Sequence, residues 1–334
     1  MPPVTLWSIG ELAEHAGVTV KTVRFYSDRG LLPEAGRSTG GHRRYGPEAL
    51  DRLRLIRSLR TLDLPVPEVG RLLEQDEVLG DALEDAVARQ LRELGSQLTA
   101  LRWREAALKL LHDCPPQERA ERLTLIGGLS TPPDTTALAR FWRRTLPPRM
   151  PARLTASIVE AAVPQPPDDP APGQVLAFAR LHALALTGCS GQGHCPNEKA
   201  RSNQDYRADV LYQGLEEAYA LASTQLLAGR DPDEGEALDS FVAAHAASWR
   251  TRDTPAFRTR LSALLTLTDD PVIDRYWRLA EELTGPGETT LGTAHSWLRT
   301  ALDGQLGREG LTAPEPWMPL PKAPAGAPAG TPAA

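Results

Sequence analysis

A short basic segment, residues 37–45, holds the side chains best suited to binding an anion. It reads RSTGGHRRY and contains three arginines and no acid. Arginine carries a permanent charge and several N–H donors, so it is well suited to holding phosphate groups. The two adjacent glycines predict a tight turn, which makes the segment a β-hairpin able to grip a nucleic acid backbone. Its candidate contact residues are Arg37, His42, Arg43, Arg44 and Tyr45.

The residues before this hairpin predict two short helices that position a second set of contacts. Ser8 and Glu11 form a capping box at the start of the first helix, and Gly17 supplies the turn that ends it. Thr19 can cap the second helix, whose outer face carries side chains that reach phosphates and base edges. The candidates on this helix are Thr19, Lys21, Thr22, Arg24 and Tyr26. Two helices followed by a basic hairpin predict a winged helix-turn-helix, with an ordinary surface helical hairpin as the alternative.

Residues 8 to about 73 resemble the DNA-binding domain of MerR-type transcriptional regulators. The resemblance rests on five segments in order: IGELA, VTVKTVRFY, RGLLP, GHRRY and ALDRLRLIRSLRTLDLPVPEVGRLLE. It implies that the first two helices read DNA, that the basic hairpin is a first wing and that the next helical pair is a second. We therefore expect a DNA-binding domain over residues 5–75.

Three positions depart from the family pattern. Ser27 stands where the family usually has an acid, and Gly46 where a Ser or Thr usually caps the third helix. Asp63 replaces the glycine of a turn. Because aspartate tolerates the left-handed backbone conformation, we expect the turn to survive.

Charge and composition limit the remaining classes. The net charge is −6, yet residues 1–75 carry 11 basic and 9 acidic residues, so the acid lies outside the predicted reader. Three cysteines do not suggest a disulfide scaffold, and there is no secretory signal, which predicts a cytoplasmic protein without a membrane partner. The sequence shows no Ser-His-Asp set, P-loop or HExxH motif, so we expect neither an enzyme nor a cofactor.

Residues 80–112 predict one long helix with a row of apolar residues at alternating spacings of four and three. The row is interrupted once, at Glu105, and its members are Val87, Leu91, Leu94, Leu98, Leu101 and Leu108. Such a row indicates a coiled-coil seam, with an amphipathic helix packed on its own core as the alternative. The family resemblance implies an antiparallel homodimer, which would present two reading heads to an inverted repeat.

The rest of the chain is predicted to be helical. Residues 113–173 contain 12 prolines and predict a linker holding two short helices, 134–146 and 152–163. Residues 174–311 predict an all-helical effector domain, and residues 312–334 a disordered tail rich in Pro and Ala. The expected fold class is mostly α: a winged helix-turn-helix with a small β-hairpin wing, a long dimerisation helix and an all-α C-terminal domain.

The C-terminal half has a second resemblance. The segments DYRADVLYQGLEEAYALAS, GEALDSFVAAHAASW and DDPVIDRYWRLAEEL resemble the drug-sensing domain of thiostrepton-induced regulators, a globin-like bundle that encloses antibiotics. The stretch WRTRDTPAF lacks the cysteine with which those regulators capture thiopeptides, so covalent capture is not expected. Aromatic walls suit flat organic ligands. The candidate effector contacts are Tyr212, Tyr219, His245, Trp249, Tyr276, Trp277 and Trp297.

Two other interpretations of this half stay open. It could be a protein-interaction module without a small-molecule site. Alternatively, Cys189, His194 and Cys195, with Asp205 or His182 as a fourth ligand, could bind a metal; an ordinary glycine-rich loop explains them as well, and we predict no metal site. The resemblances together imply a dimer that binds and distorts double-stranded promoter DNA, responds to a small organic effector and acts on RNA polymerase.

Overall fold

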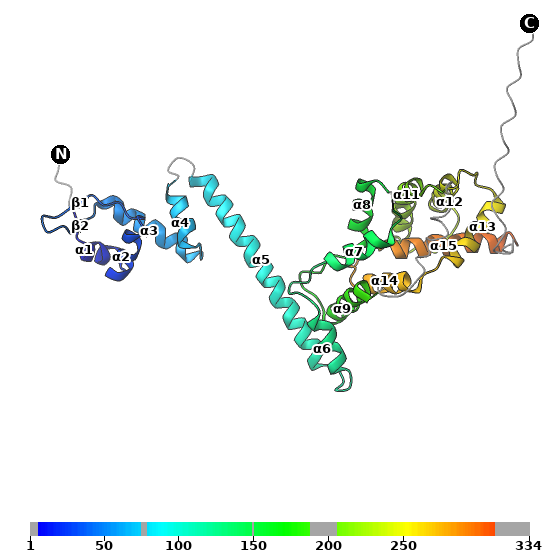
Figure 1. The fold of residues 1–334 in the computed structure, drawn as a ribbon, viewed down its shortest axis with the longest axis horizontal. Coiled ribbons are helices and arrows are strands. Elements are labelled where there is room, and N and C mark those ends of the chain that lie inside the picture. Colours follow the sequence, from blue (N-terminus) through cyan, green and yellow to red (C-terminus); the bar gives the residue numbers. More distant parts are fainter. Residues whose placement is uncertain (1–5, 75–78, 149, 188–205, 311–334) are drawn as a thin grey trace, which may run out of the picture. The chain divides into compact units, whose positions relative to one another are not determined.

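The computed structural model describes residues 6–74, 79–148, 150–187 and 206–310 (Figure 1). The chain divides into two compact units, residues 1–98 and 99–334. Helices dominate the described residues, and two strands of two residues each form a small antiparallel sheet. The mostly α fold class is therefore confirmed. Among the described helices, none combines the length and the hydropathy that crossing a bilayer requires.

The first two helices begin and end where local chemistry predicts. In α1 (Ile9–Ala16), the Glu11 backbone N–H donates to Ser8 Oγ at 3.3 Å and the Ser8 N–H donates to Glu11 Oε2 at 2.6 Å. Gly17 ends the helix in the left-handed conformation, with φ 61°. At the start of α2 (Val20–Asp28), the Thr19 hydroxyl accepts from the Thr22 N–H at 3.1 Å. Both predicted caps are confirmed.

The basic segment forms the predicted hairpin. Strands β1 (Gly36–Arg37) and β2 (Arg43–Arg44) pair antiparallel, and Gly41 has φ 80° in the turn between them. An isolated bridge between Trp7 and Tyr45 ties the end of the hairpin to the segment before α1. The hairpin is therefore anchored at its base, and residues 38–42, which include His42, form the turn between its strands.

Helices α3 (Pro47–Thr61) and α4 (Val66–Glu74) complete the first unit, with the start of α5 (Leu79–His112). Gly46 supplies no side-chain cap to α3, but a proline at the first helical position begins the helix. Asp63 lies in the turn before α4 with φ 59°, so the expected left-handed turn is confirmed. The core of this unit is apolar and includes Leu12, Val23, Leu53, Ile56, Leu64, Val69 and, from α5, Ala86.

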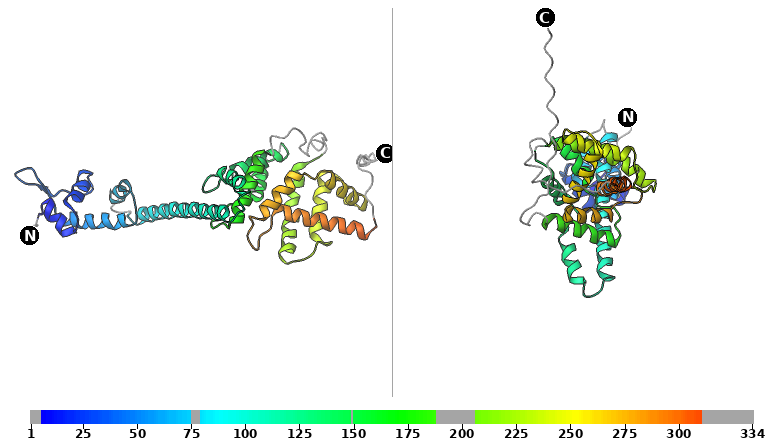
Figure 2. Two further views of the ribbon diagram at one scale, coloured as in Figure 1. Left: turned by 90° about the horizontal axis from the view of Figure 1, so that it is seen from below. Right: turned by 90° about the vertical axis from the view of Figure 1, so that its right-hand side faces the viewer.

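The regular elements in the described part of the second unit are all helices. Helices α6 (Arg119–Gly127), α7 (Thr136–Thr145), α8 (Ala152–Ala162) and α9 (Pro172–Thr187) share one apolar cluster with the end of α5 and with α14 (Pro271–Glu281). Helices α11 (Ala208–Leu227), α12 (Glu236–Ser248), α13 (Pro255–Leu267) and α15 (Leu291–Arg308) form a second cluster, and α14 contacts α15 (Figure 2). The described part of residues 174–311 is helical, as predicted.

The two short helices predicted within residues 113–173 are present as α7 and α8, but the segment is packed into the domain and is not a linker. Leu138, Phe141 and Trp142 of α7 are buried in one apolar cluster with Phe178 of α9 and Tyr276 of α14. The prolines do interrupt the helices, but the short helices between them bury large aromatic side chains. A dense series of turns is therefore part of the domain core here, and the boundary predicted at residue 174 cuts through that core.

Candidate functional site

The outer face of α2 presents the predicted basic residues to solvent. Lys21 and Arg24 are exposed, whereas Thr22 is half-buried. The hydroxyls of Thr19 and Thr22 lie 2.8 Å apart and belong to the helix cap. Lys21 and Arg24 are therefore the side chains of this predicted set that extend freely from the helix.

A neighbouring pair on α2 was missed by the sequence interpretation. Phe25 is 40% exposed, and the Arg29 guanidinium lies over its ring at 3.6 Å from the centroid. Arg29 follows Phe25 by four positions, which places the two side chains on one face of a helical turn. An exposed aromatic ring covered by a cation offers a flat, charged surface beside Lys21 and Arg24. The spacing of an aromatic and an arginine was the available signal.

Two predicted contact residues are corrected by their burial. Tyr45 is fully buried, and its hydroxyl lies 2.7 Å from Ser27 Oγ; Tyr26 is only 8% exposed. A phenol inside the core cannot reach a phosphate, so the expectation that Tyr45 presents its hydroxyl to DNA is wrong. Ser27, the departure from the family acid, is the partner of that hydroxyl.

The two arginines of β2 differ in how many contacts their guanidinium groups make within the protein. The Arg43 guanidinium donates to Ser27 Oγ at 3.0 Å and to Asp28 Oδ1 at 2.5 Å, and lies 2.7 Å from Glu34 Oε1. The hydrogen bond to Asp28, followed by the charge of Glu34, raises the pKa of Arg43. Arg44 lies 4.0 Å from Glu11, a looser contact. Arg43 therefore fixes the hairpin against α2, while Arg44 is more available to an external anion.

Several other arginines of the first unit hold the fold together instead of facing a ligand. Arg52 donates to the Leu73 carbonyl and Arg57 to the Ala16 carbonyl, both at 2.6 Å. These bonds connect α3 to α4 and α1. A count of basic residues therefore overstates the cations that a nucleic acid could contact.

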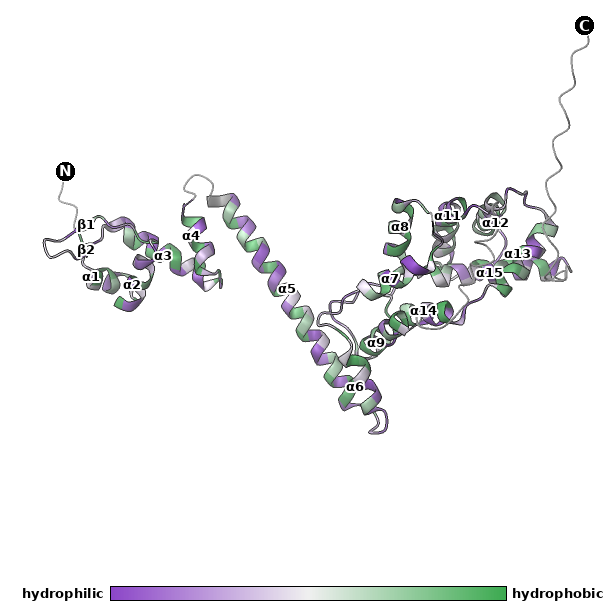
Figure 3. Cartoon of the chain, viewed as in Figure 1, coloured by the Kyte–Doolittle hydropathy of each residue, from purple (hydrophilic) through white to green (hydrophobic). Residues whose placement is uncertain are grey.

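The leucine row of α5 is uncovered in the single chain. Five of its members are 45–67% exposed: Leu91, Leu94, Leu98, Leu101 and Leu108. Val87 is half-buried, and every residue from 91 to 98 is exposed. Figure 3 shows hydrophobic and hydrophilic residues alternating along this helix. The alternative, a helix packed on the core of its own chain, fits only residues on another face of α5. Examples are Trp103, Ala106 and Leu110, which are buried in an apolar cluster.

Most of the predicted effector residues belong to, or pack against, two separate apolar clusters, and they do not line one cavity. Tyr276 is fully buried, and its hydroxyl donates to the Ala162 carbonyl at 2.9 Å. The Trp297 indole N–H donates to the Arg230 carbonyl at 3.1 Å. Both side chains are therefore core residues, which corrects their assignment as ligand contacts.

The polar members of this set form a buried group. The Tyr219 hydroxyl lies 3.0 Å from His295 Nδ1, and the ring of Phe241 packs against both His295 and His245. No hydrogen bond reaches His245 Nε2 among the described residues. Burial, and secondarily the charge of His295, lowers the pKa of His245 to about 3. Burial also raises the pKa of Tyr212 to about 12. These residues stay neutral inside the bundle.

Trp249 and Trp277 remain partly accessible. Trp249 packs against Tyr206 at 4.9 Å between ring centroids. Trp277 lines a hollow of about 300 Å³ together with Gln165, Glu288 and Thr290. Of the predicted effector residues, Trp277 is thus one that borders a cavity.

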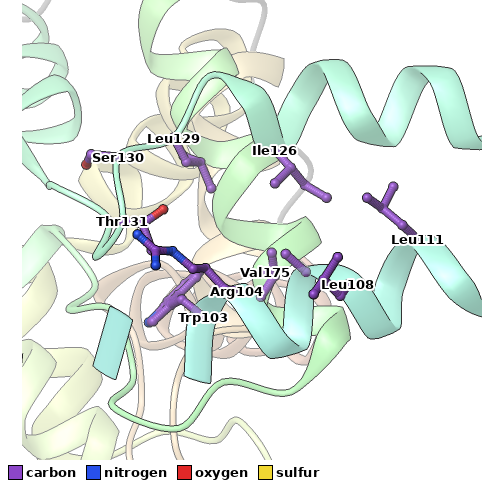
Figure 4. A pocket seen from close by; sticks show the side chains of 10 residues that line it. Trp103, Arg104, Leu108, Leu111, Ile126, Leu129, Ser130, Thr131 and Val175 are labelled. Atoms are coloured by element: carbon purple, nitrogen blue, oxygen red, sulfur yellow. The ribbon is translucent and has the colours of Figure 1, made fainter. Parts of the chain in front are cut away.

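A second, mostly apolar cavity was not predicted from the sequence. It has a volume of about 330 Å³ and lies between the end of α5, α6 with the residues that follow it, and α9 (Figure 4). Its walls come from segments up to 72 residues apart in the sequence, so no local motif signals it. Its ten lining residues are Trp103, Arg104, Ala107, Leu108, Leu111, Ile126, Leu129, Ser130, Thr131 and Val175.

The candidate metal ligands Cys189, His194, Cys195 and Asp205 lie outside the described residues. Within the described part of the chain, no group of three or more His, Cys, Asp or Glu side chains could hold a metal ion. Cys114 is buried as a free thiol.

Comparison with known proteins decides the family. Residues 7–76 match the family described as MerR HTH family regulatory protein. The mercuric resistance operon regulatory protein of Serratia marcescens is 33% identical over 126 residues, which cover 36% of this chain and 86% of that protein. The chain belongs to the MerR family. The 126 residues aligned with the Serratia protein outnumber those of the matched family domain, residues 7–76.

Other MerR-type relatives share only part of their length with this chain. The nodulation protein NolA of Bradyrhizobium elkanii is 42% identical over 83 residues, 25% of this chain and 38% of NolA. The HTH-type transcriptional activator TipA of Streptomyces coelicolor is 48% identical over 68 residues, 20% of this chain and 27% of TipA. That match is shorter than the first unit alone, so the resemblance of the C-terminal half to a drug-sensing domain stays a prediction.

Proposed function

We propose that this protein is a homodimeric regulator that binds and distorts promoter DNA and responds to an organic effector through its second unit. The observation that carries the proposal is the combination, in one chain, of a MerR-type reading head and an uncovered leucine row on the helix that follows it. A single head is too small to select a promoter, and two-fold symmetry would supply the second.

The leucine row supports a dimer on physical grounds. Four exposed leucines at alternating spacings of three and four, and a fifth seven residues further on, face water in the monomer. Burying a leucine side chain contributes roughly 1.5–3 kcal/mol, so a second copy of the row is the partner that would cover it with matching periodicity. The acidic and basic residues around the row keep the rest of the helix surface solvated.

The proposed DNA surface consists of basic residues of α2 and the hairpin that are exposed or, for Arg44, half-buried. Lys21 and Arg24 extend from α2, and Arg37, His42 and Arg44 lie on the hairpin, with the Phe25–Arg29 pair alongside. Phosphate contacts of this kind supply affinity and its salt dependence. An effector that binds one protein conformation better than the other would shift the DNA distortion and with it the access of RNA polymerase.

The test combines assembly and DNA binding. Sedimentation equilibrium of the full chain should give a dimer, and Leu98→Glu, which places a charge in the middle of the row, should give a monomer with its helical signal retained. Ser96→Glu is the matched control, because Ser96 is exposed and lies off the row. On DNA fragments selected for binding to the native protein, the protein should protect a two-fold symmetric footprint. A native chain that stays monomeric, or a Leu98→Glu variant that stays dimeric, contradicts the proposed interface.

A further inference from the structure

The cavity beside the end of α5 is an apolar hollow with fixed walls. Trp103 is only 3% exposed, and its indole N–H donates to the Pro167 carbonyl at 3.0 Å. Its ring also meets that of Phe178 edge-on, with centroids 5.6 Å apart. A hydrogen bond and a ring contact therefore hold this wall in place, and a ligand would find the surface already formed.

The opening of the cavity is lined by apolar side chains that solvent can reach. Leu108 is 67% exposed, and α6 has no fully buried side chain, although Ile126 lies on the cavity wall. Figure 4 shows Leu108, Ile126 and Leu111 around one end of the hollow and Arg104 with Thr131 at the other. An apolar body placed here would shield leucine and isoleucine surface from water.

Arg104 gives the cavity its charge. It is the one ionisable side chain among the ten lining residues, and no ion pair with it is found in the described part of the chain. Its neighbours on α5 are paired: Arg102 with Asp169 at 4.0 Å, and Lys109 with Glu105 at 2.7 Å. A guanidinium without a carboxylate partner at the edge of an apolar hollow is complementary to an organic anion.

We propose that this cavity binds an amphipathic organic anion, a flat apolar body carrying one carboxylate or sulfonate. The apolar body lies against Trp103 and Val175, and the acid group meets Arg104 near the hydroxyls of Ser130 and Thr131. The proposal rests on the effector response proposed above and names its site and ligand class. Leu108 belongs to both the cavity and the leucine row, so an occupied cavity changes the surface that the row offers to its partner.

The experiment uses the full-length protein without DNA and two fluorescent probes of similar shape. Anilinonaphthalene sulfonate is anionic, and N-phenylnaphthylamine is its neutral counterpart. Both should bind at one site per chain. Arg104→Gln should lower the affinity for the anionic probe by about tenfold, the loss expected for one charge-assisted contact. The affinity for the neutral probe should change by less than about twofold. Arg102→Gln is the matched control, because it removes a charge from the same helix outside the cavity, and it should change neither affinity.

A second variant tests the location independently of charge. Ala107→Phe fills the cavity and should abolish binding of both probes, with thermal unfolding confirming that the variant is folded. If that variant does not fold, Leu129→Phe replaces it, since Leu129 lines the same cavity from the other side.

Three results would overturn the proposal: no binding of either probe, equal loss of both probes in Arg104→Gln, or binding that survives a filled cavity. If the native dimer binds neither probe and the Leu98→Glu monomer binds both, a second copy of the chain covers the cavity and the assignment to a ligand is wrong. Because no step of this assay involves DNA, a failure of promoter binding would be detected separately.

Discussion

The hydroxyl groups of Ser27 and Tyr45 lie 2.7 Å apart inside the first unit, with Tyr45 fully buried and Ser27 only 5% exposed. Arg43 donates to the same serine oxygen. Ser27 lies in the last turn of α2 and Tyr45 follows the hairpin, so this buried pair joins the helix that carries Lys21 and Arg24 to the segment that carries the wing. The orientation of one contact set relative to the other depends on it.

Tyr45→Phe should therefore lower stability and leave the DNA contacts in place. Loss of one buried hydrogen bond should reduce the free energy of unfolding by about 1 kcal/mol, measured by urea denaturation. Tyr26→Phe is the matched control, because no hydrogen bond of the Tyr26 hydroxyl is found among the described residues, and it should change stability less. A Tyr45→Phe variant with native stability but weaker DNA binding would show that the Tyr45 hydroxyl contacts DNA after all.

The two wing arginines should respond differently to replacement. Arg44→Ala should reduce the slope of log affinity against log salt by roughly 1, because it removes one phosphate contact. Arg43→Ala should loosen the hairpin, seen as faster amide exchange over residues 36–44, because Asp28 and Glu34 lose their shared partner. Equal effects of the two variants on the salt slope, with unchanged amide exchange, would mean that Arg43 contacts phosphate as Arg44 does.

Acid should destabilise the second unit through its buried histidines. Burial lowers the pKa of His245 to about 3 and that of His295 to about 4, against an ordinary value of 6.5. Between about pH 6.5 and 4 the unfolded chain binds these protons and the folded chain does not, so stability falls as the pH decreases through this window. Each histidine contributes at most about 1.4 kcal/mol per pH unit.

The variant His245→Leu should flatten that pH dependence, measured by urea unfolding at pH 7 and pH 5. His112→Leu, at an exposed histidine of the same unit, is the control. If His245→Leu loses as much stability between the two pH values as the native protein does, His245 is not a source of the acid sensitivity.

The second unit should fold as a fragment only when the end of α5 is included. Residues 99–310 contain the whole apolar cluster around Tyr276 and should unfold cooperatively in urea. A fragment of residues 173–310 lacks Trp103, Leu138, Phe141 and Trp142, and should leave the fully buried Phe178 exposed to water. Cooperative unfolding of the shorter fragment would show that α7 and α8 are an appendage after all.

Features that depend on neighbouring residues could be predicted from the sequence. The Ser8–Glu11 cap, the Thr19 cap, the hairpin and the left-handed turn at Asp63 each involve residues within a few positions of one another. Their backbone geometry is set by local hydrogen bonds and φ preferences, and the structure confirms all four.

Features that depend on segments far apart in the sequence could not be predicted in this way. The basic neighbours of Tyr45 predict that it lies on the DNA surface, and only the packing of α2 against this segment buries it. The aromatic residues of α11–α15 have helical spacing, which suits a core as well as a pocket. The cavity at Arg104 is formed by α5, α6 and α9 together, so it has no sequence pattern of its own.

The prolines between α5 and α9 also affect the unfolded chain. Residues 113–173 contain 12 of them, between helices or at the start of α9, and side chains of these helices belong to the core. Because each proline fixes its own φ, the denatured segment samples fewer backbone conformations and loses less entropy on folding. A segment made of short helices, each too short to be stable alone, is thereby stabilised without added contacts. Replacing exposed prolines by glycine should weaken the second unit while its packed core stays intact.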